Sequence, residues 1–142
     1  MNKLAIAAAL IGLAAVAYFT FGPDTNAPTE VADAGGGPIV QVVLPAALTA
    51  EQELGKTIFE AKCAVCHAVN AVGQEGVAPP LVHKIYEPSH HGDEAFQRAV
   101  ALGVCGHHWT FGDMPPVDGL TRGDVKMVVA YIRALQRENG IN

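Results

Sequence analysis

Apolar and polar positions divide this chain of 142 residues into three stretches of different character. Leu4 to Phe21 contains no charged residue and is mostly Ala, Leu, Ile and Val. Residues 22–38 are rich in proline, glycine and acidic residues without apolar periodicity, which is typical of a flexible tether. The β-branched run Ile39 to Leu44 lies between two prolines, and we expect it to be an extended segment laid on a folded domain. Helical spacing begins after it.

Two helices are expected in the middle of the chain. The first begins at Thr49, because this N-cap residue has Gln52 three positions later and acidic residues in its first turn. It leads into Cys63 along an apolar stripe formed by Leu54, Ile58, Phe59 and Ala61. A shorter helix is expected from Asp93 to about Leu102.

The longest helix is expected near the C-terminus. Thr121 or Asp124 caps it, and it continues through Gln136 or beyond. Its apolar stripe consists of Val125, Val128, Val129, Ile132 and Leu135. Arg133 and Arg137 are basic residues near its end, where they suit the helix dipole. The pattern therefore predicts an all-α domain with three main helices and long loops. Its roughly 95 residues form only a small core without a cofactor.

The apolar run at the N-terminus allows two interpretations. A cleaved signal peptide would use the small-residue site Ala15-Val16-Ala17. An uncleaved anchor would use the whole run, which just reaches the length that spans a bilayer. We favour the anchor, because the run continues well past the cleavage site. Lys3 marks the cytoplasmic side in both cases. We therefore expect the protein to be anchored on the periplasmic side of the inner membrane, or to be soluble in the periplasm if the signal is cleaved.

The charge balance bears on partners. The formal net charge is −5, and it becomes −6 from residue 22 onward because only Lys3 is removed. An acidic surface argues against nucleic acid and favours protein partners with basic patches, although ordinary solubility explains it equally well.

The candidate chemistry lies in Cys63-Ala64-Val65-Cys66-His67, which has the C-x-x-C-H pattern of haem c attachment. Two thiols on one helical turn can each form a thioether with a haem vinyl group, and His67 can bind the iron. A bare C-x-x-C also occurs in redox dithiols and zinc sites. The following histidine and the lack of a second C-x-x-C argue against both. We therefore expect one haem c, covalently bound by Cys63 and Cys66.

With these landmarks, residues 48 to 140 resemble the class I c-type cytochromes. In that family a glycine on the first helix lets it cross close to the last helix, a role that falls here to Gly55, with Phe59 one turn later. The resemblance implies a crossing at Ala130-Tyr131 and a cytochrome c-like fold around the haem.

Two loops carry the rest of the resemblance. Ala78-Pro79-Pro80-Leu81 is similar to the family's Gly-Pro-x-Leu, in which the proline carbonyl accepts a hydrogen bond from the proximal histidine. The resemblance implies that Pro79 orients His67. Gly112-Asp113-Met114-Pro115-Pro116 resembles the loop of the sixth iron ligand, which implies Met114 as a neutral ligand that raises the reduction potential.

Four histidines and a third cysteine lie outside that pattern, in His90-His91 and Cys105-Gly106-His107-His108. Such spacing can bind zinc or copper, but consecutive residues point apart in most backbones. We favour surface histidines without a metal, and we expect Cys105 to be buried and inert. His108 and Trp109 could hydrogen-bond a haem propionate or line the pocket.

The predicted function is one-electron transfer and not catalysis, because an iron with two protein ligands cannot bind substrate without losing one. We expect a monomer that serves membrane respiratory or photosynthetic complexes or periplasmic oxidoreductases. The alternatives are a haem enzyme or small-ligand sensor, supported only by the region of Cys105, and a subunit of a larger oxidoreductase. The predicted parts are a signal or anchor (1–21), a linker (22–46) and a cytochrome c domain (47–142).

Overall fold

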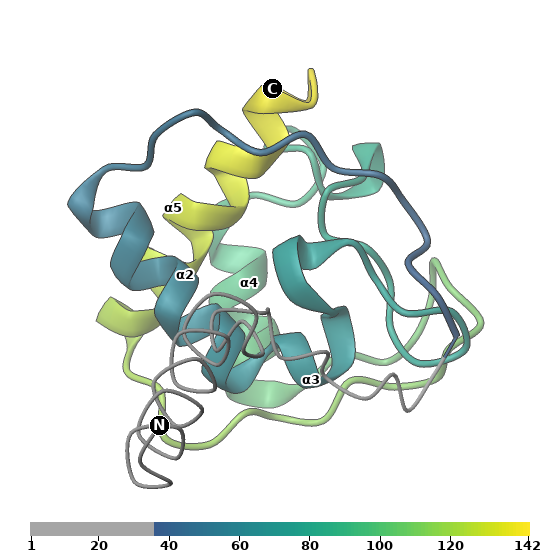
Figure 1. Cartoon of the computed structure of the whole chain (residues 1–142). Helices are drawn as coiled ribbons and strands as arrows, with labels where there is room; N and C mark the ends of the chain where they lie inside the picture. The colour runs from purple at the N-terminus through teal and green to yellow at the C-terminus, as the bar shows by residue number, and fades with distance from the viewer. Residues whose placement is uncertain (1–35) are drawn as a thin grey trace, which may run out of the picture. The chain divides into compact units, whose positions relative to one another are not determined.

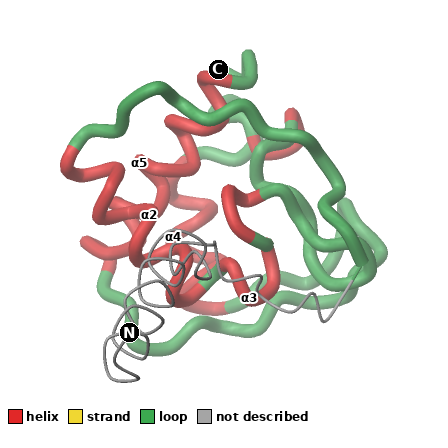
Figure 2. The backbone as a smooth tube through the Cα atoms, viewed as in Figure 1, coloured by secondary structure: helices red, strands yellow, loops and turns green. Residues whose placement is uncertain are grey.

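The computed structural model describes residues 36–142, and the regular elements in this range are all helical (Figure 2). They are α2 (Ala50–Lys62), α3 (Ala64–His67), the 3-10 turns η1 (Val69–Ala71) and η2 (Lys84–Tyr86), α4 (Asp93–Leu102) and α5 (Arg122–Glu138). The prediction of an all-α domain with three main helices is confirmed. The predicted signal or anchor and the first part of the linker lie outside the described residues. Within 36–142, each helix is too short or too polar to traverse a bilayer.

Both long helices begin where their caps predict. The Thr49 hydroxyl accepts from the Gln52 amide at 3.3 Å, and the Gln52 side chain accepts from the Thr49 amide at 2.9 Å. Thr121 and Asp124 form the same reciprocal pair at the start of α5. A capping box satisfies amide donors that the first helical turn leaves free, which is why these starts are readable from sequence.

The helices α2 and α5 cross closely, as the resemblance implies (Figure 1). A Cβ on Gly55 would lie only 2.5 Å from the carbonyl carbon of Met127, so only glycine fits this crossing. The Phe59 ring meets the Tyr131 ring one turn further along, with centroids 5.8 Å apart. The expected partner of Gly55, Ala130-Tyr131, was therefore wrong by about one turn: Tyr131 packs on Phe59 instead.

The apolar stripe of α5 is buried throughout, whereas that of α2 is only partly so. On α2 the buried positions are Gly55 and Phe59, Ile58 is half-buried, and Leu54 and Ala61 are exposed. The prediction for the last two was wrong. Gly55 and Phe59 are four residues apart and so lie on one narrow line of the helix, and Leu54 is turned about 100° from Gly55.

Residues 36–44 run as an extended segment over the domain, past the C-terminal end of α5 and into α2 (Figure 1). The Ile39 amide donates to the Val72 carbonyl at 3.2 Å. The Asn139 side chain bonds both main-chain groups of Val43, accepting from its amide at 2.9 Å and donating to its carbonyl at 2.8 Å. The expectation of an extended segment laid on the domain is confirmed.

A buried polar pair on α5 holds the loop between residues 81 and 93. The Arg133 guanidinium, only 7% exposed, donates to the Tyr86 and His91 carbonyls, each at 2.6 Å, and to Asp93 at 3.0 Å. Gln136, fully buried, accepts from Arg133 at 2.6 Å and donates to the Leu81 and Tyr86 carbonyls at 2.8 and 3.0 Å. Arg133 therefore holds a loop in place. The sequence indicated only that this basic residue lies near the end of the helix, where it suits the helix dipole.

Candidate functional site

The three residues of the C-x-x-C-H pattern that carry chemistry lie on one helical turn. The Cys63 carbonyl, at the end of α2, accepts from the Cys66 amide at 3.1 Å and from the His67 amide at 2.9 Å. Neither cysteine forms a disulfide; Cys63 is half-buried and Cys66 is exposed. Burial raises the pKa of the Cys63 thiol to about 11, and the neighbouring Cys66 adds to the shift, so the thiol stays protonated at neutral pH.

His67 is oriented by the main chain of Pro79. The imidazole is 9% exposed, and its Nδ1 lies 2.8 Å from the Pro79 carbonyl oxygen, so the contact implied by the resemblance is present. A carbonyl oxygen only accepts, so Nδ1 carries the proton and Nε2 keeps its lone pair. Burial lowers the pKa of His67, and the bond to Pro79 partly opposes this. The neutral imidazole therefore presents Nε2 as a metal ligand.

A tightly turned loop brings Pro79 back to His67. Ala68, Asn70 and Ala71 all adopt positive φ angles near 58°, a conformation that L residues rarely adopt and that commonly marks functional sites. The Asn70 side chain accepts from the Tyr131 hydroxyl at 3.1 Å, which fixes the turn against α5. Further along, the Gly73 amide donates to the His67 carbonyl at 2.9 Å.

The alanine at position 78 replaces the usual glycine without disturbing this loop. Its amide donates to the Gln74 carbonyl at 3.0 Å, and its carbonyl accepts from the Gln74 amide at 2.9 Å. Its φ is not among the positive ones, so a Cβ is tolerated here. Pro79 therefore keeps its position although the glycine is missing.

Met114 lies on a second loop, paired with Val104 through two main-chain hydrogen bonds of 2.9 Å. The loop between them is closed by the Asp113 carboxylate, which accepts from the Gly106 amide at 2.8 Å. Cys105 is exposed on this loop, so the expectation of a buried thiol was wrong. Successive side chains of an extended pair point to opposite sides, and Val104 takes the more buried one.

Comparison with known families agrees with this geometry. Residues 52–136 match the family model described as Cytochrome c, and these 85 residues are more than half of the chain. The chain belongs to the cytochrome c family. Members of this family typically carry electrons by means of a haem. The expected resemblance to cytochromes c and the expected all-α fold are confirmed. No curated protein and no solved structure shows a significant match.

The residues of this cytochrome fit a haem c. Two cysteine thiols on one helical turn and a histidine with a free Nε2 supply the covalent and axial groups that the cofactor needs. The buried Trp109 indole Nε1 forms no hydrogen bond of normal geometry with any described residue. Burial raises the pKa of the Tyr86 hydroxyl, and a weaker interaction with this indole lowers it. A haem carboxylate would give this donor an acceptor.

The sequence interpretation missed the Arg133–Gln136 pair that holds the loop between residues 81 and 93. A signal was available, because Arg133 follows Val129 by four residues and Gln136 follows Ile132 by four. Both polar residues thus lie on the apolar face of α5, and a buried polar residue must find partners. Their partners, main-chain carbonyls of a distant loop, had no sequence signal.

The consecutive histidines were expected to point apart and instead lie together. The ring centroids of His90 and His91 are 4.7 Å apart, and those of His107 and His108 are 4.2 Å apart. The two pairs also meet, with 5.4 Å between His90 and His108. The expectation that the consecutive histidines point apart was therefore wrong.

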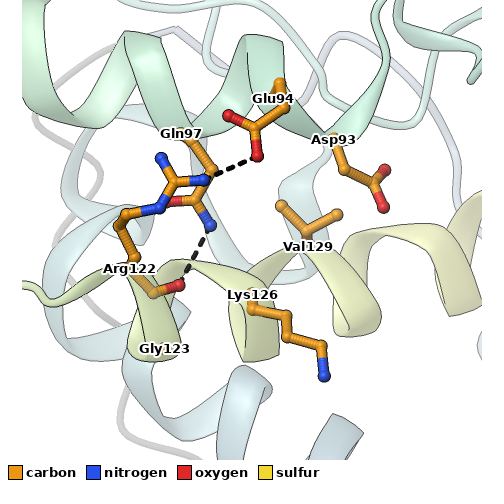
Figure 3. Close-up of a pocket in the computed structure, with 7 residues that line it drawn as sticks. All are labelled: Asp93, Glu94, Gln97, Arg122, Gly123, Lys126 and Val129. Carbon is orange, nitrogen blue, oxygen red and sulfur yellow. Dashed lines mark hydrogen bonds and ion pairs between the residues drawn. The ribbon is translucent and has the colours of Figure 1, made fainter.

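An open groove between α4 and α5 lies apart from the predicted site residues (Figure 3). Within it, Arg122 and Glu94 form an exposed ion pair of 2.6 Å, and the Gln97 side chain donates to the Arg122 carbonyl at 3.0 Å. The groove is lined by Asp93, Glu94, Gln97, Arg122, Gly123, Lys126 and Val129. Four of these residues are charged, and the ion pair between Arg122 and Glu94 joins the two helices.

Proposed function

We propose that this cytochrome is a one-electron carrier with one haem c, bound covalently by Cys63 and Cys66 and axially by His67 and Met114. The observation that supports it most is the 2.8 Å contact between His67 Nδ1 and the Pro79 carbonyl inside a C-x-x-C-H turn. That contact leaves a neutral Nε2 on a fixed imidazole, which is what a permanent axial ligand requires. When bound, the haem supplies the one-electron change between ferric and ferrous iron.

Met114 completes the proposal as the sixth ligand. Two contacts join the arms of its loop: the main-chain pairing of Met114 with Val104, and the hydrogen bond from the Gly106 amide to the Asp113 carboxylate. A thioether on such a pinned loop can stay in place through a redox change, which suits an electron carrier. Met127, by contrast, lies within α5 and packs at the crossing with α2.

Replacing Met114 by alanine tests this assignment on the haem-loaded protein. A weak band at the red end of the ferric spectrum marks ligation of the iron by methionine, and we expect it to vanish in this variant. We also expect the reduction potential to fall and the ferrous protein to bind carbon monoxide readily. Met127→Leu is the matched control and should keep the wild-type spectrum. Rapid binding of carbon monoxide by wild type, or a band that survives in Met114→Ala, would contradict the ligand assignment.

Covalent attachment is tested separately. The double variant Cys63→Ala, Cys66→Ala should yield no holoprotein, or holoprotein whose haem extracts into acidified solvent. Cys105→Ser is the control and should retain its haem, since the exposed thiol of Cys105 lies on the other loop. Freely extractable haem in wild type would contradict the proposal at its base.

We also propose that redox proteins dock beside the C-x-x-C-H turn. Cys66 is exposed there, and the adjacent apolar side chains Val65 and Val69 are 77% and 45% exposed. Small exposed apolar patches are commonly used for transient docking, and the acidic net charge favours partners with basic patches. Candidate partners are membrane respiratory or photosynthetic complexes and periplasmic oxidoreductases, each met by a monomer.

The proposed location is the periplasmic side of the inner membrane, with the N-terminal apolar run as an anchor. A tether keeps the domain near membrane-bound partners and so raises the rate of encounter without a new contact. N-terminal sequencing of the mature protein, together with fractionation, tests this. A soluble chain that begins at Tyr18 or later would refute the anchor and leave electron transfer untouched.

The second candidate function is a haem enzyme or small-ligand sensor. Its specific support is the exposed thiol of Cys105, which lies on the loop that leads to Met114. If that thiol takes part in chemistry, Cys105→Ser should abolish an activity or ligand response while the spectrum stays the same. If the protein is instead an electron carrier, Cys105→Ser should leave its rate of electron transfer unchanged.

A further inference from the structure

Four imidazoles from two separate loops gather on the surface of this cytochrome. His90 and His91 precede α4, and His107 and His108 lie on the loop before Met114. The ring of His108 lies 5.4 Å from that of His90 and 5.3 Å from that of His91. One ligand nitrogen from each of these three residues falls within 4.8 Å of the others.

We propose that His90, His91 and His108 form a binding site for a divalent transition-metal cation of the zinc or copper(II) type. The set contains three imidazoles and neither a carboxylate nor a thiol. Imidazole ligands suit zinc and copper, whereas magnesium and calcium require oxygen ligands. Three protein ligands leave the remaining coordination position to water.

A hydrogen bond from the His91 ring to the main chain orients His91 as a ligand. Its Nδ1 lies 2.6 Å from the Ile85 carbonyl oxygen, which can only accept, so Nδ1 carries the proton and Nε2 keeps the lone pair. Metal-binding histidines in proteins are commonly oriented in this way. The main chain of His91 is itself held, because its carbonyl accepts from the buried Arg133 at 2.6 Å. The charge of Arg133 is paired with Asp93 at 3.0 Å.

Only a small movement is needed to close the site. Metal–nitrogen bonds of about 2.0–2.1 Å in a tetrahedron place the nitrogens about 3.3–3.4 Å apart. The present nitrogens lie within 4.8 Å of one another. His90 and His108 are exposed and so can rotate toward the better-anchored His91. The site is therefore partly preorganised, with one fixed and two adjustable ligands.

Partial desolvation lowers the pKa of His108, and His107, His91 and His90 lower it further. Neutral imidazoles are the form that binds metal. A bound cation would tie the loop of His90 and His91 to the loop of His108. The site does not involve the proposed axial ligands, and zinc would bind it even if Met114 did not bind iron.

A calorimetric titration of the untagged, haem-loaded full chain with zinc chloride tests the site. We expect one zinc per chain with micromolar or tighter affinity, and a thermal midpoint higher by on the order of 10 °C at a 100-fold excess over Kd. Copper(II) should bind the same site, with nitrogen hyperfine structure in its paramagnetic resonance spectrum. His90→Gln, His91→Gln and His108→Gln should each weaken zinc binding at least 10-fold.

The matched control is His107→Gln, which removes a neighbouring imidazole that is not one of the three whose ligand nitrogens lie within 4.8 Å of one another. It should retain zinc affinity within about twofold. Unsaturable binding up to 100 µM zinc would overturn the proposal, as would equal affinity in wild type and in His108→Gln. A loss in His107→Gln as large as that in His108→Gln would refute the assigned set of ligands.

Discussion

An alanine at Gly55 would place a methyl group in the crossing of α2 and α5. The new Cβ would overlap the carbonyl oxygen of Met127 and would lie 2.5 Å from its carbonyl carbon and 3.1 Å from the amide nitrogen of Val128. Carbon atoms in contact are normally about 3.5–4.0 Å apart, so the helices must separate by more than about 1 Å. The obstructing atoms belong to the backbone, and no change of rotamer removes them.

The expected cost follows from two opposing effects. Forcing an extra carbon into a packed interface typically costs about 1–3 kcal/mol, and a backbone obstacle favours the upper end. A helical glycine replaced by alanine regains about 0.5–1 kcal/mol of helix propensity. Gly55→Ala should therefore lower the free energy of unfolding by about 2 kcal/mol. For a domain of this size that corresponds to a fall of about 8–16 °C in the thermal midpoint.

Denaturant unfolding of the haem-loaded protein, followed by far-ultraviolet circular dichroism, measures this effect. Gly123→Ala is the matched control, since Gly123 also lies in a helix but its Cβ would meet only the Thr121 hydroxyl at an ordinary 3.5 Å. The control should be as stable as wild type or slightly more so. If Gly55→Ala unfolds within 0.5 kcal/mol of wild type, the argument that backbone contact requires glycine here is refuted.

Three further predictions concern the contacts that hold the loops and helix ends. Arg133→Met leaves the His91 carbonyl and the buried side-chain oxygen of Gln136 without their donor and should destabilise the domain by about 3 kcal/mol, measured by unfolding, whereas the exposed Arg137→Met should have little effect. Asn139→Ala removes both bonds to Val43 and should expose residues 36–46 to rapid proteolysis, mapped by mass spectrometry, while the core stays folded. Hydrogen bonds in the capping box lower the pKa of Asp124 below its ordinary 3.8, so the stability it contributes is present above that pH and is lost as pH falls through the lowered value. Acid unfolding of Asp124→Asn should accordingly depend less on pH between 4 and 2 than that of wild type.

Much of the fold was readable because its signals are local. The helix starts at Thr49 and Thr121 depend on side chains three residues apart, and the limits of α4 depend on spacing within ten residues. The stripe of α5 was predicted correctly because a long helix with one buried side shows the 3.6-residue period clearly. The stripe of α2 was predicted poorly, because a close crossing at a glycine buries a narrow line and leaves Leu54 exposed.

Residues that act across long sequence separations had no such signal. Arg133 and Gln136 could be recognised as unusual on an apolar face, but their carbonyl partners lie 42 to 55 residues away. The exposure of Cys105 likewise depends on the pairing of its neighbour Val104 with Met114, for which the sequence carries no signal. Hydrogen bonds to main-chain carbonyls are independent of the residue type that supplies them, so no pattern of side chains announces them.

The sequence by itself determined the helices, the C-x-x-C-H turn and, through resemblance, the contact between His67 and Pro79. Each of these rests on residue types whose chemistry or backbone preference is specific: a cap, a thiol, an imidazole, a glycine at a crossing. Only the tertiary structure decided which polar residues are buried and that four histidines from two loops meet. The physical reason is that convergence of distant loops is set by the packing of the helices between them, here by a buried arginine on α5 that holds His91 in place.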